Sequence, residues 1–173
     1  MYVTSDPEVE ARALLDRYWS GKSLPVDPVE IARALGVEVL RAELPGNVSG
    51  VLLKQVGHEP RIVVHAGDHE NRRRFSVAHE LGHFVQRSSA VVEDKDQYEY
   101  VDLRSPASSD GTNSDEVFAN KFAAELLMPE HLVRPFSEKI RAAGALSSVF
   151  GVSIDAMSFR LRNLRLYQPA ATA

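Results

Sequence analysis

The stretch His79-Glu80-Leu81-Gly82-His83 has the form His-Glu-x-x-His, in which two imidazoles and a carboxylate can serve one metal ion. On a helix, positions i and i+4 lie on one face, so both histidines can direct a ring nitrogen at an ion about 2.1 Å away. Asp68 precedes the stretch and is a candidate N-cap. The other face predicts packing against a core, because it is an apolar stripe made of Val77, Leu81, Phe84 and Val85. The motif can also arise by chance in a surface helix. That explanation is weaker here, because it would have to account both for the motif and for the amphipathic helix that surrounds it.

A catalytic zinc ion has three protein ligands and one open position for water, so a third ligand is needed. The metzincin pattern is excluded, because Gln86 and Ser89 stand where it requires Gly and His. Residues 114–129 are rich in helix formers and end in a proline, and Glu116 in this segment is our candidate. Two alanines on its helical face would let the helices approach closely; that face comprises Ala119, Asn120, Ala123 and Leu127. By spacing alone, Glu116 could equally well be a metal ligand or a first-turn glutamate that interacts favourably with the helix dipole or closes a capping box with Asn113.

Taken together, the two motifs resemble those of the ImmA/IrrE family of bacterial and phage metallopeptidases. The match comprises Arg74-Phe75-Ser76-Val77-Ala78-His79-Glu80-Leu81-Gly82-His83, followed by Glu116-x-x-Ala119-Asn120-x-Phe122-Ala123-Ala124-x-Leu126-Leu127-Met128-Pro129. The similarity extends over residues 24–167, nearly the whole chain. The sequence departs from the family at His65, where members often have asparagine, and at Gln86, where another histidine is common.

The resemblance implies a zincin-like metallopeptidase that holds one zinc ion through His79, His83 and Glu116. It also implies the substrate class, because members of the family cleave helix-turn-helix repressors of the Xre type and thereby switch on genes. Glu80 is then the catalytic base. It lies beside the ligand His79 but outside the ligand set, so it can take a proton from water and pass it to the leaving amine. We therefore expect a zinc-dependent endopeptidase whose protein substrate is such a repressor.

A rival hypothesis keeps the same ligands but assigns no catalysis. In it, the protein is a regulator with a structural or idle zinc site that binds DNA or a partner protein through its C-terminal helices. Glu80 favours the enzyme, since a purely structural site does not need this residue. The sequence does not identify the group that would stabilise the oxyanion; the candidates are His58, His65, His69, His131, Tyr98 and Tyr100.

The composition is that of one globular unit, because 44% of the 173 residues are hydrophobic and 25% are charged. The chain contains no cysteine, so disulfides and thiolate ligands are excluded, which is compatible with a reducing cytoplasm. Residues 1–20 lack the apolar core of a signal peptide, and no segment approaches the roughly 18 apolar residues of a membrane span. We therefore expect a cytoplasmic protein that does not enter the membrane.

Periodicity and turn signals predict an α+β fold with a small antiparallel sheet. Helices are expected at residues 7–19 and 29–35, and short strands at residues 37–40, 48–54 and 61–65. Residues 88–113 are polar and acidic, and we expect a surface loop there with one strand at residues 97–103. The zincin-like domain that contains these elements and the active-site helices is assigned to residues 1–130.

Residues 131–173 are expected to form a C-terminal helical subdomain packed on that domain. They carry a net charge of +4, whereas the rest of the chain carries −8. Two helices, at residues 142–150 and 153–164, are joined by Gly151-Val152 and together resemble a helix-turn-helix. If the pair bound DNA, phosphates would be contacted by Arg160, Arg162 and Arg165. Because the whole protein is acidic, we expect instead that the pair packs on the core, that the arginines only solvate it, and that DNA is not bound.

The run Arg72-Arg73-Arg74 also allows two interpretations. It could grip an acidic substrate, or it could pair with neighbouring acids such as Asp68 and Glu70, which is the commoner outcome. The sequence makes no prediction of the oligomeric state.

Overall fold

The computed structural model describes residues 6–90, 100–104 and 114–166. In chain order the elements are α1 (Pro7–Tyr18), α2 (Pro28–Ala34), β1 (Glu38–Ala42), β2 (Gly50–Lys54), β3 (Arg61–His65), α3 (Glu70–Ala90), β4 (Tyr100–Arg104), α4 (Ser114–Leu127), α5 (Glu130–Lys139), α6 (Ala143–Phe150) and α7 (Ile154–Asn163). The α+β class expected from the sequence is confirmed.

The sheet is mixed, with the strand order β1-β3-β2-β4. β2 runs antiparallel to both β3 and β4, as expected. β1 pairs with β3 in parallel, from Glu38 opposite Arg61 to Ala42 opposite His65, so the prediction of a purely antiparallel sheet is wrong for this pair. The cause is the apolar composition of β3, which favours a position between two strands, whereas β1 is largely exposed and lies at the edge. β3 therefore inserts between β1 and β2.

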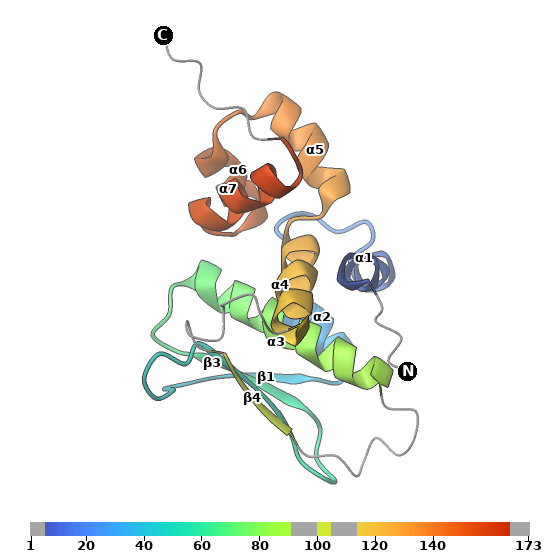
Figure 1. Cartoon of the computed structure of the whole chain (residues 1–173), viewed down its shortest axis with the longest axis vertical. Coiled ribbons are helices and arrows are strands. Elements are labelled where there is room, and N and C mark those ends of the chain that lie inside the picture. The colour runs from blue at the N-terminus through green and yellow to red at the C-terminus, as the bar shows by residue number, and fades with distance from the viewer. Residues whose placement is uncertain (1–5, 91–99, 105–113, 167–173) are drawn as a thin grey trace.

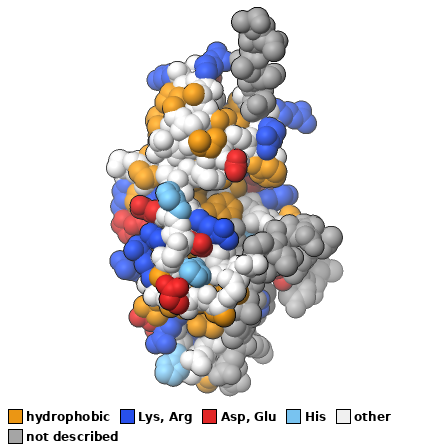
Figure 2. Space-filling model, turned by 90° about the vertical axis from the view of Figure 1, so that its left-hand side faces the viewer, with side chains coloured by type: hydrophobic (Ala, Val, Ile, Leu, Met, Phe, Trp, Pro, Cys, Tyr) orange, Lys and Arg blue, Asp and Glu red, His pale blue; other side chains and the backbone are white. Residues whose placement is uncertain are grey.

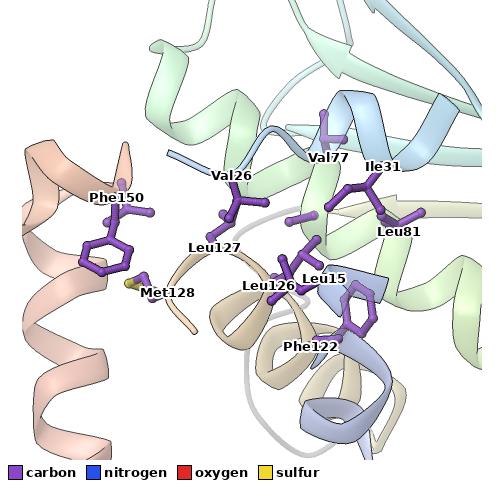
Figure 3. Packing of buried hydrophobic residues seen from close by; sticks show 14 of the residues in the cluster. Leu15, Val26, Ile31, Val77, Leu81, Phe122, Leu126, Leu127, Met128 and Phe150 are labelled. Carbon is purple, nitrogen blue, oxygen red and sulfur yellow. The ribbon is translucent and has the colours of Figure 1, made fainter. Parts of the chain in front are cut away.

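The helices are stacked in layers on one face of the sheet (Figure 1). α3 packs on β2 and β3, and α2 packs against α3 and β1. α4 crosses α3 on the side away from the sheet, and α1 packs on α4. Figure 3 shows the side chains that join these layers, which include Leu15, Ile31, Val77, Leu81, Phe122 and Leu126. The residues of α3 that carry the His-Glu-x-x-His motif are thus enclosed between the sheet and α4.

Capping side chains explain where the first two helices begin. The carboxylate of Asp6 accepts a hydrogen bond from the backbone N–H of Glu8 at 2.8 Å, and that of Asp27 accepts one from Val29 at 2.9 Å. A proline follows each cap at the first helical position. Both helices agree with their expected ranges to within one residue at each end.

α3 differs from the expectation at both ends. It begins at Glu70 and is capped by the ring of His69, whose Nδ1 accepts from the backbone N–H of Asn71 at 3.2 Å. Asp68 is therefore not the N-cap; its Oδ2 lies 3.2 Å from Nε of Arg72. At its other end α3 continues to Ala90, so residues 88–90 are helical and not part of the expected loop. Residues 91–99 and 105–113 of that loop lie outside the described residues, and the expected strand is present as β4.

The C-terminal helices form a group at one end of the molecule (Figure 1). α6 and α7 were expected, but α5 was missed because Pro135 lies inside it and proline disfavours a helix interior. The rings of Phe136 and Phe150 pack edge to face, with centroids 5.7 Å apart, and join α5 to α6. Phe150 in turn lies beside Met128 at the end of α4 (Figure 3).

A buried arginine fixes α7 to the core. Only 3% of Arg160 is exposed, and its guanidinium forms an ion pair with the fully buried Glu125 of α4. It also donates to the backbone oxygen of Met128 at 3.1 Å and lies 3.3 Å from Glu8 of α1. Arg160 is thus a packing residue and is not available to contact DNA, so the expectation that all three arginines only solvate the helix pair is wrong for this one.

The three consecutive arginines at the start of α3 also bind within the protein. Arg72 pairs with Asp68, and Arg73 donates to the backbone oxygens of Ala66 and Asp68. Arg74 donates to backbone oxygens of Val26 and, at 2.9 Å, of Gly151. Burial lowers the pKa of Arg74 from its usual value, and the nearby carboxylates of Asp27 and Glu70 act in the opposite direction. The expected pairing with a neighbouring acid is thus present for Arg72, whereas the hydrogen bonds of Arg73 and Arg74 go to backbone oxygens.

No described helix is both long and apolar enough to cross a membrane.

Candidate metal centre

α3 places His79 and His83 one turn apart on the face that meets α4. Both side chains are buried, with exposed fractions of 1% and 4%. Their Nε2 atoms lie 3.1 Å apart, so the two rings converge on one point. The expected geometry of the motif on a helix is therefore present.

α4 brings Glu116 to the same point. Its Oε1 lies 3.2 Å from Nε2 of His83, and its Oε2 lies 3.4 Å from Nε2 of His79. The three residues each offer one ligand atom, and these atoms lie within 4.8 Å of one another. The sequence left two roles open for Glu116, and its position supports the role at the site. Asn113, its partner in the capping alternative, lies outside the described residues.

The spacing of these atoms fits a small tetrahedral ion. A zinc ion with bonds of about 2.0–2.1 Å separates neighbouring ligand atoms by about 3.3 Å. The two histidine nitrogens lie 3.1 Å apart, and each lies 3.2–3.4 Å from a different oxygen of Glu116; with one ligand atom taken from each residue, the three atoms lie within 4.8 Å of one another. Two imidazoles and a carboxylate are also a ligand set that zinc accepts, and they leave one tetrahedral position for water. The residues present therefore fit a zinc ion.

A close approach of the two helices makes this convergence feasible. A Cβ atom added to Gly82 would lie 3.0 Å from the Cα atom of Ala119, which is tighter than nine in ten real Cβ contacts. Ala119 itself is completely buried. The expectation that small residues let these helices approach is confirmed, and Gly82 supplies the α3 half of the contact.

Asn120 orients the first histidine. Its Oδ1 lies 3.0 Å from Nδ1 of His79. An amide oxygen can only accept a hydrogen bond, so Nδ1 of His79 carries the proton and Nε2 keeps a lone pair for a metal. Sequence spacing alone did not predict this role for Asn120. The signal was nevertheless present, because Asn120 follows Glu116 by one helical turn and lies on the same face.

Glu80 lies next to this group but outside it. The residue is completely buried, and its carboxylate packs against Gly50 at the start of β2. The candidate ligand residues of α3 face α4, whereas the carboxylate of Glu80 meets Gly50 of the sheet. Within one turn, α3 thus carries both the histidines that can hold an ion and a carboxylate that can exchange a proton.

The other polar residues considered from the sequence lie elsewhere or have local roles. His65 accepts at Nδ1 from the backbone N–H of Gly67 at 2.9 Å, and His69 caps α3. Gln86 donates to Asp115 at 2.9 Å and links α3 to α4 beside the ligands. Tyr98 and the side chain of Tyr100 lie outside the described part of the chain. Among the described residues, none is identified as an oxyanion-stabilising group.

An α+β fold in which a His-Glu-x-x-His helix faces a glutamate of a second helix defines a candidate metallopeptidase. Comparison with known proteins narrows the class. The chain belongs to the peptidase M78 family described as IrrE N-terminal-like domains, whose model matches residues 32–162. This confirms the resemblance drawn from the two motifs.

A transcriptional regulator of Mycobacterium tuberculosis has a similar structure, with a TM-score of 0.63 and 19% sequence identity. The similarity covers 90% of this chain but 46% of the regulator, so the chain spans less than half of that protein. At this identity the likeness establishes the fold. No curated protein sequence matches the chain at a significant level. Family and fold together indicate a metallopeptidase or a regulator of the IrrE type.

Proposed function

We propose that this protein is a zinc-dependent endopeptidase. The observation that carries the proposal is the convergence of His79, His83 and Glu116 beside the buried carboxylate of Glu80. A site that only stabilised the fold would need the three ligands but not the additional acid. The family assignment supports the same conclusion.

In the proposed mechanism the ligand residues bind the metal ion and Glu80 transfers the proton. A zinc ion held by His79, His83 and Glu116 would supply Lewis acidity, which polarises a peptide carbonyl and lowers the pKa of water to about 7. Asn120 keeps Nδ1 of His79 protonated, so that Nε2 remains a ligand. Glu80 accepts the proton of the attacking water on its carboxylate and delivers it to the nitrogen of the leaving amine.

The substrate we propose is a helix-turn-helix repressor of the Xre type, whose cleavage would derepress genes. This step rests on the family resemblance and is in keeping with a neighbour that is named a transcriptional regulator. We place the reaction in the cytoplasm, where such a repressor acts and where a chain without cysteine has no need of an oxidising compartment. We place the boundary between the metallopeptidase domain and the C-terminal helical subdomain near residue 130, where α4 gives way to α5.

The test is to replace Glu80 with Gln and to incubate the protein with the repressor encoded beside its gene, with and without a chelator. Glu80→Gln preserves size but cannot accept the proton. Zinc content should be unchanged, and repressor cleavage should fall by about 10²- to 10⁴-fold. The chelator should abolish cleavage by the parent protein.

Asp115→Asn is the matched control, because it makes the same chemical change on an exposed residue beside the site. This control should cleave at the parental rate. Parental cleavage by a fully zinc-loaded Glu80→Gln protein would remove Glu80 from the mechanism. Zinc binding without any cleavage by the parent, together with specific DNA binding, would favour the rival regulator.

A further inference from the structure

We infer that Gly50 is the positioning residue for the catalytic carboxylate of Glu80, and that the absence of a side chain at this position is what leaves room for the base. The inference rests on the proposed function, since it assigns a role within the same reaction. It concerns a residue of β2, which lies 29 residues or more before the metal ligands in the sequence and contributes no ligand.

The contact between the two residues is too close for any side chain on Gly50. A Cβ atom built there would lie 2.8 Å from Oε1 of Glu80, 3.3 Å from Cγ and 3.4 Å from Cδ. Real Cβ atoms essentially never come within 3.0 Å of another heavy atom. Glu80 is completely buried, so its carboxylate cannot escape into solvent. A methyl group at Gly50 would therefore displace the carboxylate within the site.

The space left by the missing side chain of Gly50 is confined to one position on the sheet, because the neighbouring positions carry large side chains. Gly50 lies opposite Val64 of β3, and Leu52 lies opposite Ile62. Alternate residues of a strand, and directly opposed residues of paired strands, share one face of a sheet. Leu52, Ile62 and Val64 belong to the buried core that also contains residues of α3. The face toward α3 is thus filled by large side chains, and Gly50 leaves it open where the carboxylate lies.

Backbone conformation does not explain the glycine. Five described glycines have a positive φ, and Gly50 is not one of them. An alanine is therefore compatible with the backbone, and the conflict is steric and directed at Glu80. Displacement of a reacting group by about 1 Å can lower the rate about 10²-fold. The candidate ligands His79 and His83 lie on the adjacent face of α3, toward α4, and are not among the atoms nearest to a Cβ built on Gly50, so they should keep their positions.

The test compares three glycine-to-alanine variants that differ in what the added methyl group meets. At Gly50 it meets the Glu80 carboxylate. At Gly82 it meets the Ala119 backbone at 3.0 Å, which should separate α3 from α4 and disturb the ligands. At Gly144 it meets only Cδ1 of Ile154 at 3.7 Å, an ordinary contact. Each zinc-loaded variant is assayed for zinc affinity by competition with a chromophoric chelator and for cleavage of the neighbouring repressor.

We expect three distinct patterns. Gly144→Ala should match the parent protein in both measurements. Gly82→Ala should lose zinc affinity and cleavage together. Gly50→Ala should keep parental zinc affinity and KM but show a kcat lowered about 10²-fold. Parental kcat in Gly50→Ala, or a loss of its zinc affinity equal to that of Gly82→Ala, would overturn the inference.

A second measurement does not depend on peptidase activity. Denaturant midpoints are compared for Gly50→Ala, Glu80→Ala and the double variant, all with zinc present. Gly50→Ala should lower the midpoint, and this effect should disappear when Glu80 is already alanine, because the clash has been removed. Recovery of folding in the double variant would support the inference even if Gly50→Ala alone did not fold. An equal loss in both backgrounds would overturn it. If this coupling is present but the parent protein does not cleave the repressor, the steric contact stands and the proposed function fails.

Discussion

Asn120 is a single residue whose hydrogen bond should set the strength of metal binding. Asn120→Ala removes the acceptor that holds Nδ1 of His79 at 3.0 Å, so the ring loses its fixed tautomer and orientation. Outer partners of metal-binding histidines typically contribute 10- to 100-fold in affinity. We expect zinc affinity, measured by chelator competition at fixed pH, to fall by about this factor.

Asn120→Asp keeps an acceptor and should retain most of the affinity. Lys121→Ala is the control, because the lysine is the next residue on α4 and is exposed. Equal zinc affinity in Asn120→Ala and in the parent protein would show that the hydrogen bond does not orient the ligand.

At the residue scale, the sequence predicted the site residues whose roles depend on helical spacing, but not those whose roles depend on tertiary contacts. His79, Glu80 and His83 could be identified because i and i+4 fix their relative directions within one helix. Glu116 required a second helix to cross the first, and spacing left its role open. Gly50 could not be identified at all, since nothing in its own strand indicates that a carboxylate from α3 packs on it.

At the scale of elements, the errors occurred where a local signal competed with packing. α5 was not predicted because it contains Pro135, which lacks a backbone N–H and disfavours a helix interior. The helix forms nevertheless, and it packs on α6 through Phe136. The strand positions were predicted well, but the parallel pairing of β1 with β3 was not. Strand order depends on which strand is most apolar across the whole sheet, and this is not visible within one strand.

The anchoring of α7 to the core should depend on the buried ion pair of Arg160 with Glu125. Arg160→Met removes one partner and leaves a buried carboxylate uncompensated, although Arg12 lies 3.3 Å from Glu125 and offsets part of this cost. Breaking a buried pair in this way costs about 3–5 kcal/mol of unfolding free energy. We expect a loss toward the lower end of that range in urea unfolding.

Arg162→Met is the matched control on the same helix, because Arg162 is exposed, and it should change the unfolding free energy by less than about 0.5 kcal/mol. Similar losses in the two variants would mean that the buried pair does not stabilise the attachment of α7.

The exposed surface of the helix pair should not bind DNA. Arg160 is buried, so of the three arginines considered from the sequence only Arg162 and Arg165 are exposed. On the face shown in Figure 2, basic side chains are mixed with acidic ones and do not form a continuous basic surface. We expect no sequence-selective, salt-sensitive gel shift. A tight shift that is abolished by Arg162→Ala with Arg165→Ala would reverse this conclusion.

For the whole molecule, a metal held between α3 and α4 should stabilise the fold, because these helices form the middle layers. A ligand at about 1,000 times its Kd adds about 4 kcal/mol. For a chain of this size that corresponds to a rise in Tm on the order of 10 °C. We expect zinc to produce such a rise and a chelator to reverse it.

The thermal shift should be lost in Glu116→Ala and kept in Asp115→Ala, since only the first of these neighbours faces the two histidines. A zinc-dependent rise that survives in Glu116→Ala but disappears in Asp115→Ala would show that the third ligand is wrongly assigned.

The pairing of β4 with β2 bears on how quickly the molecule can fold. Tyr100 lies opposite Lys54, with all of β3 and α3 between them in the chain, whereas β2 and β3 form a local hairpin. Closing a long loop costs chain entropy before the distant strands gain any contact, so such pairings form slowly. In refolding followed by pulsed hydrogen exchange, amides shared by β2 and β3 should become protected before those of β4. Simultaneous protection would contradict this order. The rate of folding should then be limited by β4 and α4, which meet their partners only after the intervening chain has been brought together.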